Sequence, residues 1–101
     1  MSEERAIRRV LIRGRVQGVG FRMWTEHEAT RRALDGWARN RRDGAVEALF
    51  AGPPDTVAAM IEACRRGPPQ SCVDAVDVHE ASLNDLGQRR AAEKFSLLPT
   101  V

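Results

Sequence analysis

Three glycines and one arginine in the first quarter of the chain could bind an anion. Gly14, Gly18 and Gly20 precede Arg22 in a short segment between a strand-like run and a helix-like run. Backbone N–H groups at the start of a helix attract negative charge, and a guanidinium can bind two phosphate oxygens at once. The segment therefore predicts a small anion site made of backbone amides and Arg22.

Asn40 is a second candidate, near the end of the second strand-like run, 36–42. If a helix carries the chain back between the first two strands, these strands run in the same direction. The end of the second strand then lies at the same sheet edge as the glycine loop. An Asn amide cannot act as a base at neutral pH, but it can accept a hydrogen bond from a water and donate one to a substrate oxygen.

The residue types alone leave a plainer interpretation open, in which the loop is only a turn, Arg22 a solvated cation and Asn40 an edge residue. Two nucleotide-binding motifs fail here. Met23 stands where G-x-G-x-x-G requires its third glycine, and the chain has no Gly-Lys-Ser/Thr. The sequence argues against a dinucleotide or nucleoside triphosphate site.

The elements that must position these residues follow from hydrophobic periodicity. Run 7–16 alternates apolar residues with arginines, which is typical of a strand with one wet face. Run 22–34 has neither Gly nor Pro and predicts a helix. Asp43-Gly44 joins strand-like runs 36–42 and 45–51 and predicts a type I′ turn. The remaining expectations are a helix opening at 52–55 and stopped at 67–69, a strand at 73–78, a polar stretch at 82–90 and a short final strand at Phe95 and Leu97.

This order, β-α-β-β-α-β, predicts an α+β ferredoxin-like sandwich, an antiparallel sheet with two helices on one face. The C-terminal residues suggest an extra short strand. With 101 residues, the chain has room for one core, so we expect a single domain over 1–101 with a flexible N-terminus at 1–6. The ferredoxin-like fold by itself does not determine function, because enzymes and binding modules share it.

Composition excludes several classes of protein. The formal net charge is only +2, and although 15 of the 16 cations are Arg, this does not by itself indicate a nucleic-acid partner. No stretch is long and apolar enough for a membrane span or a signal peptide, so we expect a cytoplasmic protein without a membrane partner. Cys64 and Cys72 fit two structural thiols, and no ligand spacing predicts a metal site.

Two motifs resemble signatures of the acylphosphatase family. The run Ile12 to Arg22, IRGRVQGVGFR, is similar to the first signature, and G-W-A-R-N-x-x-x-G-x-V-x-x-x-x-x-G from Gly36 to Gly52 is similar to the second. They stand in the expected order with the expected internal spacing. The similarity of layout extends from about Ile7 to Leu98.

The resemblance implies a ferredoxin-like enzyme that hydrolyses the carboxyl–phosphate anhydride of small acyl phosphates to a carboxylate and inorganic phosphate, without metal or cofactor. By position, Arg22 is the phosphate-binding arginine and Asn40 orients the attacking water. The implied phosphate-binding amides are those of Gln17, Gly18, Val19, Gly20, Phe21 and Arg22. One departure is Ala33, where the family commonly has Gly. If that position needs a positive φ, Ala33 costs about 1 kcal/mol.

Two other functions are compatible with the same fold. An RNA-binding module would carry aromatics on the open sheet face and a basic-aromatic run, whereas this chain has no Tyr, only five aromatic residues and no such run. A phosphate-binding protein without turnover would keep the loop, but the presence of both Arg22 and Asn40 argues against it. Arg39, Arg41 and Arg42 could steer an anionic substrate, although a solvated cluster is the simpler interpretation. We expect a monomer, and the sequence does not identify the physiological acyl group.

Overall fold

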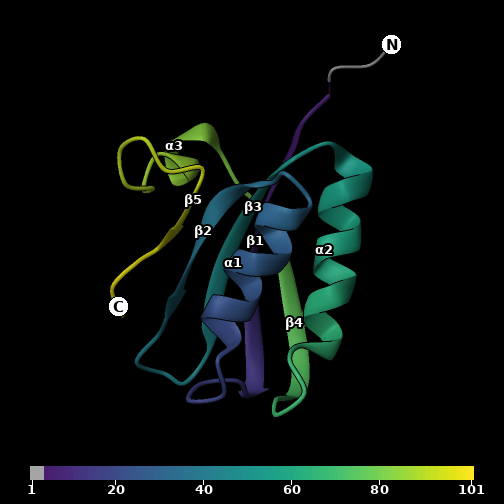
Figure 1. Cartoon of the computed structure of the whole chain (residues 1–101), viewed down its shortest axis with the longest axis vertical. Coiled ribbons are helices and arrows are strands. Elements are labelled where there is room, and N and C mark those ends of the chain that lie inside the picture. The colour runs from purple at the N-terminus through teal and green to yellow at the C-terminus, as the bar shows by residue number, and fades with distance from the viewer. Residues whose placement is uncertain (1–3) are drawn as a thin grey trace.

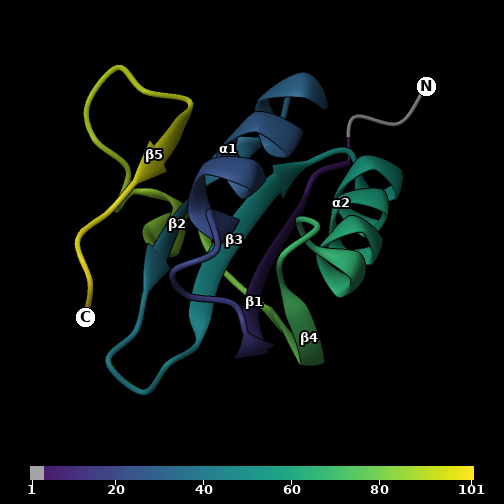
Figure 2. The same cartoon turned by 60° about the horizontal axis from the view of Figure 1, so that its bottom comes forward.

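The computed structural model describes residues 4–101 and contains a five-stranded sheet with two long helices on one face (Figures 1 and 2). Residues 1–3 of the N-terminal segment predicted to be flexible lie outside the described residues, and Ala6 is the buried first residue of the first strand. The elements are β1 (Ala6–Arg15), α1 (Phe21–Arg31), β2 (Asp35–Asn40), β3 (Val46–Gly52), α2 (Pro54–Arg66), β4 (Cys72–Glu80), α3 (Leu83–Leu86) and β5 (Phe95–Leu97).

The sheet has the strand order β4-β1-β3-β2-β5, which confirms the ferredoxin-like fold. Strand β3 pairs antiparallel with both β1 and β2. These two strands therefore run in the same direction and end at the same edge of the sheet. The extra C-terminal strand forms, but β5 is parallel to β2, so the sheet is mixed rather than purely antiparallel.

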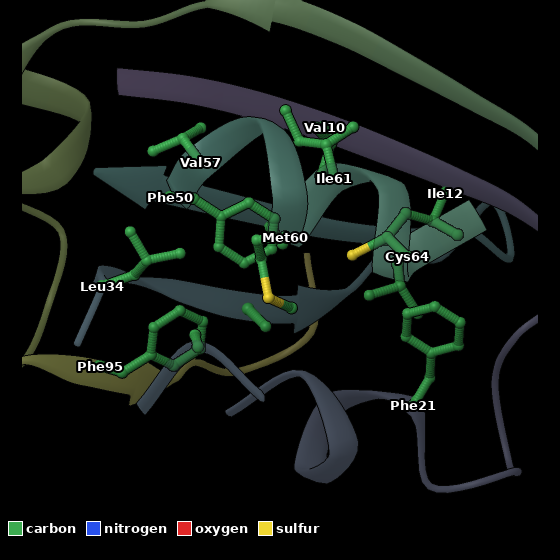
Figure 3. Packing of buried hydrophobic residues seen from close by; sticks show 14 of the residues in the cluster. Val10, Ile12, Phe21, Leu34, Phe50, Val57, Met60, Ile61, Cys64 and Phe95 are labelled. Atoms are coloured by element: carbon green, nitrogen blue, oxygen red, sulfur yellow. The ribbon is translucent and has the colours of Figure 1, made fainter. Parts of the chain in front are cut away.

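The core lies between the sheet and helices α1 and α2 (Figure 3). Val10 and Ile12 are fully buried on the helix side of β1, as the period-two pattern predicts. On α2, the residues predicted to face the core are buried: Val57, Met60, Ile61 and Cys64. Burial of each of the larger of these side chains contributes about 1.5–3 kcal/mol to stability.

Helix α1 is shorter than the predicted 22–34, because the chain leaves the helix at Ala33. The Leu34 amide donates to the Ala29 carbonyl and the Ala33 amide to the Thr30 carbonyl, which is a Schellman ending. This ending requires a positive φ, and Ala33 adopts φ 57°. Leu34 is thereby turned into the core.

The connection between β2 and β3 is not the predicted type I′ turn. That turn needs positive φ at both central residues, whereas in this loop only Gly44 has one, at 96°. The Gly44 amide donates to the Arg41 carbonyl, and Asp43 Oδ1 accepts from the Ala45 amide. The Asp43 carboxylate thus favours a longer turn, from Arg41 to Ala45.

The opposite face of the sheet carries a second, smaller cluster over part of its area. Trp37 and Leu49 pack there against Leu86 of α3. A capping box of Ser82 and Asp85 holds α3, whose existence the sequence pattern did not predict. The Trp37 indole N–H donates to the Asp85 carbonyl. The aromatic ring on this face is therefore covered, contrary to what an RNA-stacking platform requires.

Candidate active site

A hollow of about 130 Å³ lies where the loop after β1, the start of α1 and the end of β2 meet. Arg22 and Asn40 both line it, although they are 18 positions apart in the sequence. The parallel directions of β1 and β2 bring them together. The lining residues are Val16, Gly18, Gly20, Phe21, Arg22, Met23 and Asn40.

The loop between β1 and α1 exposes backbone N–H groups because two glycines adopt left-handed conformations. Gly18 has φ 75° and Gly20 has φ 80°. The first helical hydrogen bond runs from the Trp24 amide to the Gly20 carbonyl. No side chain of the described residues caps this end of α1. The amides of Phe21, Arg22 and Met23 therefore remain free donors at the start of α1 and could bind an anion.

Arg22 and Asn40 are half-buried at the hollow. Within residues 4–101, neither the Arg22 guanidinium nor the Asn40 side-chain amide has a protein partner. Most other arginines near the turn are engaged with carboxylates. The two groups can therefore turn all their hydrogen-bonding capacity toward a bound anion and a water.

Not all six residues whose amides the resemblance assigns to phosphate binding contribute to the hollow. Four of the six line it, whereas Gln17 and Val19 do not. Val19 packs against the core, and the Gln17 side chain turns toward the β2–β3 turn. Met23, with 70% of its surface exposed, does line the hollow, although no sequence motif considered above includes it. The sequence signal that could have identified Met23 is a large apolar side chain directly after Arg22.

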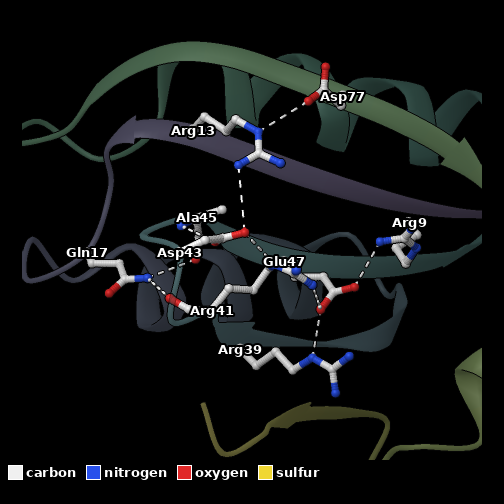
Figure 4. Close-up of polar contacts among 9 residues, drawn as sticks. All are labelled: Arg9, Arg13, Gln17, Arg39, Arg41, Asp43, Ala45, Glu47 and Asp77. Atoms are coloured by element: carbon white, nitrogen blue, oxygen red, sulfur yellow. Dashed lines mark hydrogen bonds and ion pairs between the residues drawn. The ribbon is translucent and has the colours of Figure 1, made fainter. Parts of the chain in front are cut away.

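Arg39 and Arg41 of the arginine cluster are bound by carboxylates on the sheet face away from the helices (Figure 4). Arg39 Nε donates to Glu47 Oε1 at 2.8 Å. The guanidinium carbon of Arg39 lies over the Trp37 ring, 4.6 Å from the ring centroid. Arg41 Nε donates to Asp43 Oδ2 at 3.1 Å. Arg42 is exposed. The paired members of the cluster therefore stabilise the sheet and its turn.

Glu47 is a buried carboxylate, with 4% of its side chain exposed. Burial alone would raise the pKa of Glu47, but the hydrogen bonds and charges of Arg39 and Arg9 outweigh it and lower this pKa. Arg9 Nη1 donates to Glu47 Oε2 at 3.0 Å. The carboxylate thus links β1, β2 and β3 as an ion.

The two cysteines are free thiols, with Cys64 buried and Cys72 exposed. Burial raises the pKa of Cys64 to about 12, so its thiol stays protonated and unreactive. No group of three or more His, Cys, Asp or Glu side chains that could hold a metal ion occurs among residues 4–101. None of the described helices is long and apolar enough to span a membrane.

The comparisons with known proteins agree with the resemblance of the two motifs. The acylphosphatase family model matches residues 8–95. An acylphosphatase from Bradyrhizobium diazoefficiens is 62% identical over 97 residues, covering 96% of this chain and 98% of the relative. Because the overlap includes nearly the whole of both chains, the likeness concerns the complete fold.

Solved structures show the same likeness. An acylphosphatase structure from Bacillus subtilis is 38% identical with a TM-score of 0.77, covering 91% of this chain and 97% of the other. One from Coxiella burnetii is 29% identical with a TM-score of 0.80, covering 93% of each chain. The loop, α1 and the end of β2 all lie within the residues that the family model matches.

Proposed function

This chain belongs to the acylphosphatase family, and we propose that its hollow between α1 and β2 is where acyl phosphates are hydrolysed. The protein is an acylphosphatase that cleaves the carboxyl–phosphate anhydride. The observation that supports the assignment of the site is that Arg22, the open start of α1 and Asn40 line one hollow.

In this proposal the loop and Arg22 bind the phosphoryl group. The amides at the start of α1 bind its oxygens, and the positive end of the helix adds to the attraction. The Arg22 guanidinium takes two oxygens and neutralises their charge. These donors stabilise the charge on the equatorial oxygens of the transition state, where phosphoryl transfer needs it most.

Asn40 positions the attacking water. Its side-chain oxygen accepts a hydrogen bond from the water and directs the water oxygen in line with the anhydride bond. The new P–O bond forms as the anhydride P–O bond breaks, and that electron pair leaves on the carboxylate. One water proton passes to a phosphate oxygen, and the other stays on the oxygen that has joined phosphorus. An acyl phosphate dianion and water thus give a carboxylate and dihydrogen phosphate.

The free energy that a site of this size can supply is sufficient for the expected rate gain. A rate gain of 10⁶ requires about 8 kcal/mol. Holding a water in line can supply on the order of 7 kcal/mol, and each preorganised donor contributes about 3–4 kcal/mol. The carboxylate is a good leaving group, so the mechanism needs no strong acid beside it.

The test is hydrolysis of benzoyl phosphate followed by absorbance in the presence of a chelator. We expect turnover by the wild type. Arg22→Ala should lower kcat/KM by about 10²–10³-fold and weaken inhibition by inorganic phosphate. Asn40→Ala should lower kcat by a similar factor, with the inhibition constant of phosphate changed by less than about 2-fold.

Two matched controls remove the same side chains elsewhere. Arg31→Ala lies at the other end of α1 and Asn84→Ala lies at an exposed position of α3, and both should keep wild-type kinetics. Normal kcat in Asn40→Ala would disprove the water-positioning role. Phosphate binding without turnover by the wild type would make the protein a binding module.

We propose a monomeric state in the cytoplasm. Both sheet edges disfavour self-pairing, since β5 has only three residues and β4 carries Asp74, Asp77 and Glu80. Antiparallel pairing of two β4 strands would bring like charges together. Light scattering tests the monomeric state and should give a mass near 11.2 kDa. Cell fractionation tests the location and should recover the protein with cytoplasmic markers. A mass of twice that value would contradict the monomer.

A further inference from the structure

The Gln17 side chain connects the loop between β1 and α1, residues 16–20, to the β2–β3 turn (Figure 4), and we call this loop the phosphate loop. Its amide nitrogen, Nε2, donates to the Arg41 carbonyl at 2.7 Å and to the Ala45 carbonyl at 2.9 Å. The side chain is partly buried at this contact. A Gln side chain has two N–H groups on one nitrogen, so both bonds form at once.

These two carbonyls belong to the first and last residues of the turn, Arg41 and Ala45. The Arg41 amide donates to the Ala45 carbonyl at 2.8 Å, which closes the turn. The Asp43 carboxylate stabilises it from inside through the Ala45 amide and Arg41. These contacts hold the turn together but do not tie it to the phosphate loop, which the Gln17 amide does.

The positions of the bonded residues connect this contact to the site. Gln17 directly precedes Gly18, which lines the hollow, and Arg41 directly follows Asn40. The contact therefore joins the backbone neighbours of the phosphate-binding loop and of the residue proposed to hold the water. Asn40 is also held by its pairing with Val46 in the sheet, so the Gln17 contact is what connects this strand end to the loop.

We propose that Gln17 is a positioning residue that sets the placement of Asn40 relative to the bound phosphoryl group. The inference rests on the proposed function of Arg22 and Asn40. In-line attack depends on placement to within about 1 Å, and an error of that size can cost about 10²-fold in rate. Loss of the Gln17 bonds should therefore lower kcat more than it weakens phosphate binding, which Arg22 and the helix start retain.

The experiment replaces Gln17 by Met, which has a similar length but no donor. For Gln17→Met we expect kcat for benzoyl phosphate to fall by about 10–100-fold. The inhibition constant of inorganic phosphate should stay within about 3-fold of the wild-type value. The matched control is Gln88→Met, which removes an exposed hydrogen bond to Arg39 and should keep wild-type kinetics.

A double-mutant cycle separates positioning from a general structural effect. If Gln17 acts through Asn40, Gln17→Met should change kcat by less than about 3-fold in the Asn40→Ala background. Circular dichroism checks that each variant is folded. Gln17→Asn replaces Gln17→Met if the latter does not fold, because its shorter amide keeps the polarity but cannot reach both carbonyls.

An equal fall in kcat in both backgrounds would overturn the proposal, as would unchanged kcat or a loss confined to phosphate affinity. Failure of the proposed function itself is recognised separately, by wild-type inactivity or by normal kcat in Asn40→Ala alone.

Discussion

Ala33 is the residue at which local backbone preference and the fold oppose each other. Its φ of 57° lies in the left-handed region, which costs a residue with a Cβ atom about 1–2 kcal/mol. The Schellman ending of α1 forms nevertheless, since it turns Leu34 into the core. Hydrophobic burial therefore outweighs the backbone strain.

Ala33→Gly should raise the free energy of unfolding by about 0.5–1 kcal/mol, because relief of the left-handed strain exceeds the added entropy of the unfolded chain. Urea unfolding measures the change. Ala59→Gly, at an exposed position inside α2, is the matched control and should lower stability by about 1 kcal/mol. If both variants were destabilised equally, the left-handed strain at Ala33 would be negligible.

At the scale of elements, Glu47 links three strands. It lies on β3, Arg9 on β1 and Arg39 on β2, and the ion pairs cross the sheet on the face away from the long helices (Figure 4). Removal of one partner leaves buried groups without hydrogen bonds, which is costly. The same pairs explain why two arginines of the sheet are unavailable for substrate.

Glu47→Gln should lower the free energy of unfolding at neutral pH by about 2 kcal/mol. Because the folded pKa of Glu47 is below its ordinary 4.5, the contribution is fully present above pH 4.5 and disappears as the pH falls through the folded value. Urea unfolding as a function of pH should therefore give a difference between wild type and variant that shrinks below pH 4.5.

Glu28, Asp43 and Asp85 also have lowered pKa values, but they occur in both proteins and cancel in this difference. Glu62→Gln, at an exposed position on α2, is the matched control and should change stability by less than about 0.5 kcal/mol. If the difference in unfolding free energy between the wild type and Glu47→Gln did not depend on pH, Glu47 would not be the ionised, paired group described here.

At the scale of the molecule, the site exists only when the loop, α1 and the end of β2 are assembled. Inorganic phosphate at ten times its dissociation constant should then stabilise the wild type by about 1.4 kcal/mol. For a domain of this size, the melting temperature should rise by roughly 6–10 °C. Thermal unfolding followed by circular dichroism measures the shift.

Arg22→Ala should lose most of the phosphate-dependent shift, and Arg31→Ala should keep it. The general stabilising effect of phosphate salts acts on all three proteins and is subtracted by this comparison. An equal shift in wild type and Arg22→Ala would place phosphate binding elsewhere.

The sequence alone determined the features that depend on neighbours along the chain. Period-two alternation identified β1, the spacing of Val57, Met60 and Ile61 identified the buried face of α2, and the order of elements predicted the sheet plan. The two motifs singled out Arg22 and Asn40, and the same-direction rule for β1 and β2 predicted that they lie at one edge. The backbone conformation of a segment and the face on which each side chain lies depend on nearby residues, so the spacing of residue types predicts them.

Features that depend on contacts between distant segments appear only in the folded structure. Gln17 bonds carbonyls 24 and 28 positions away, and Trp37 reaches the Asp85 carbonyl 48 positions away. The direction of β5 and the burial of Glu47 likewise follow from which strands become neighbours. Hydrogen-bond partners across a fold are set by three-dimensional packing, which no spacing within one segment contains.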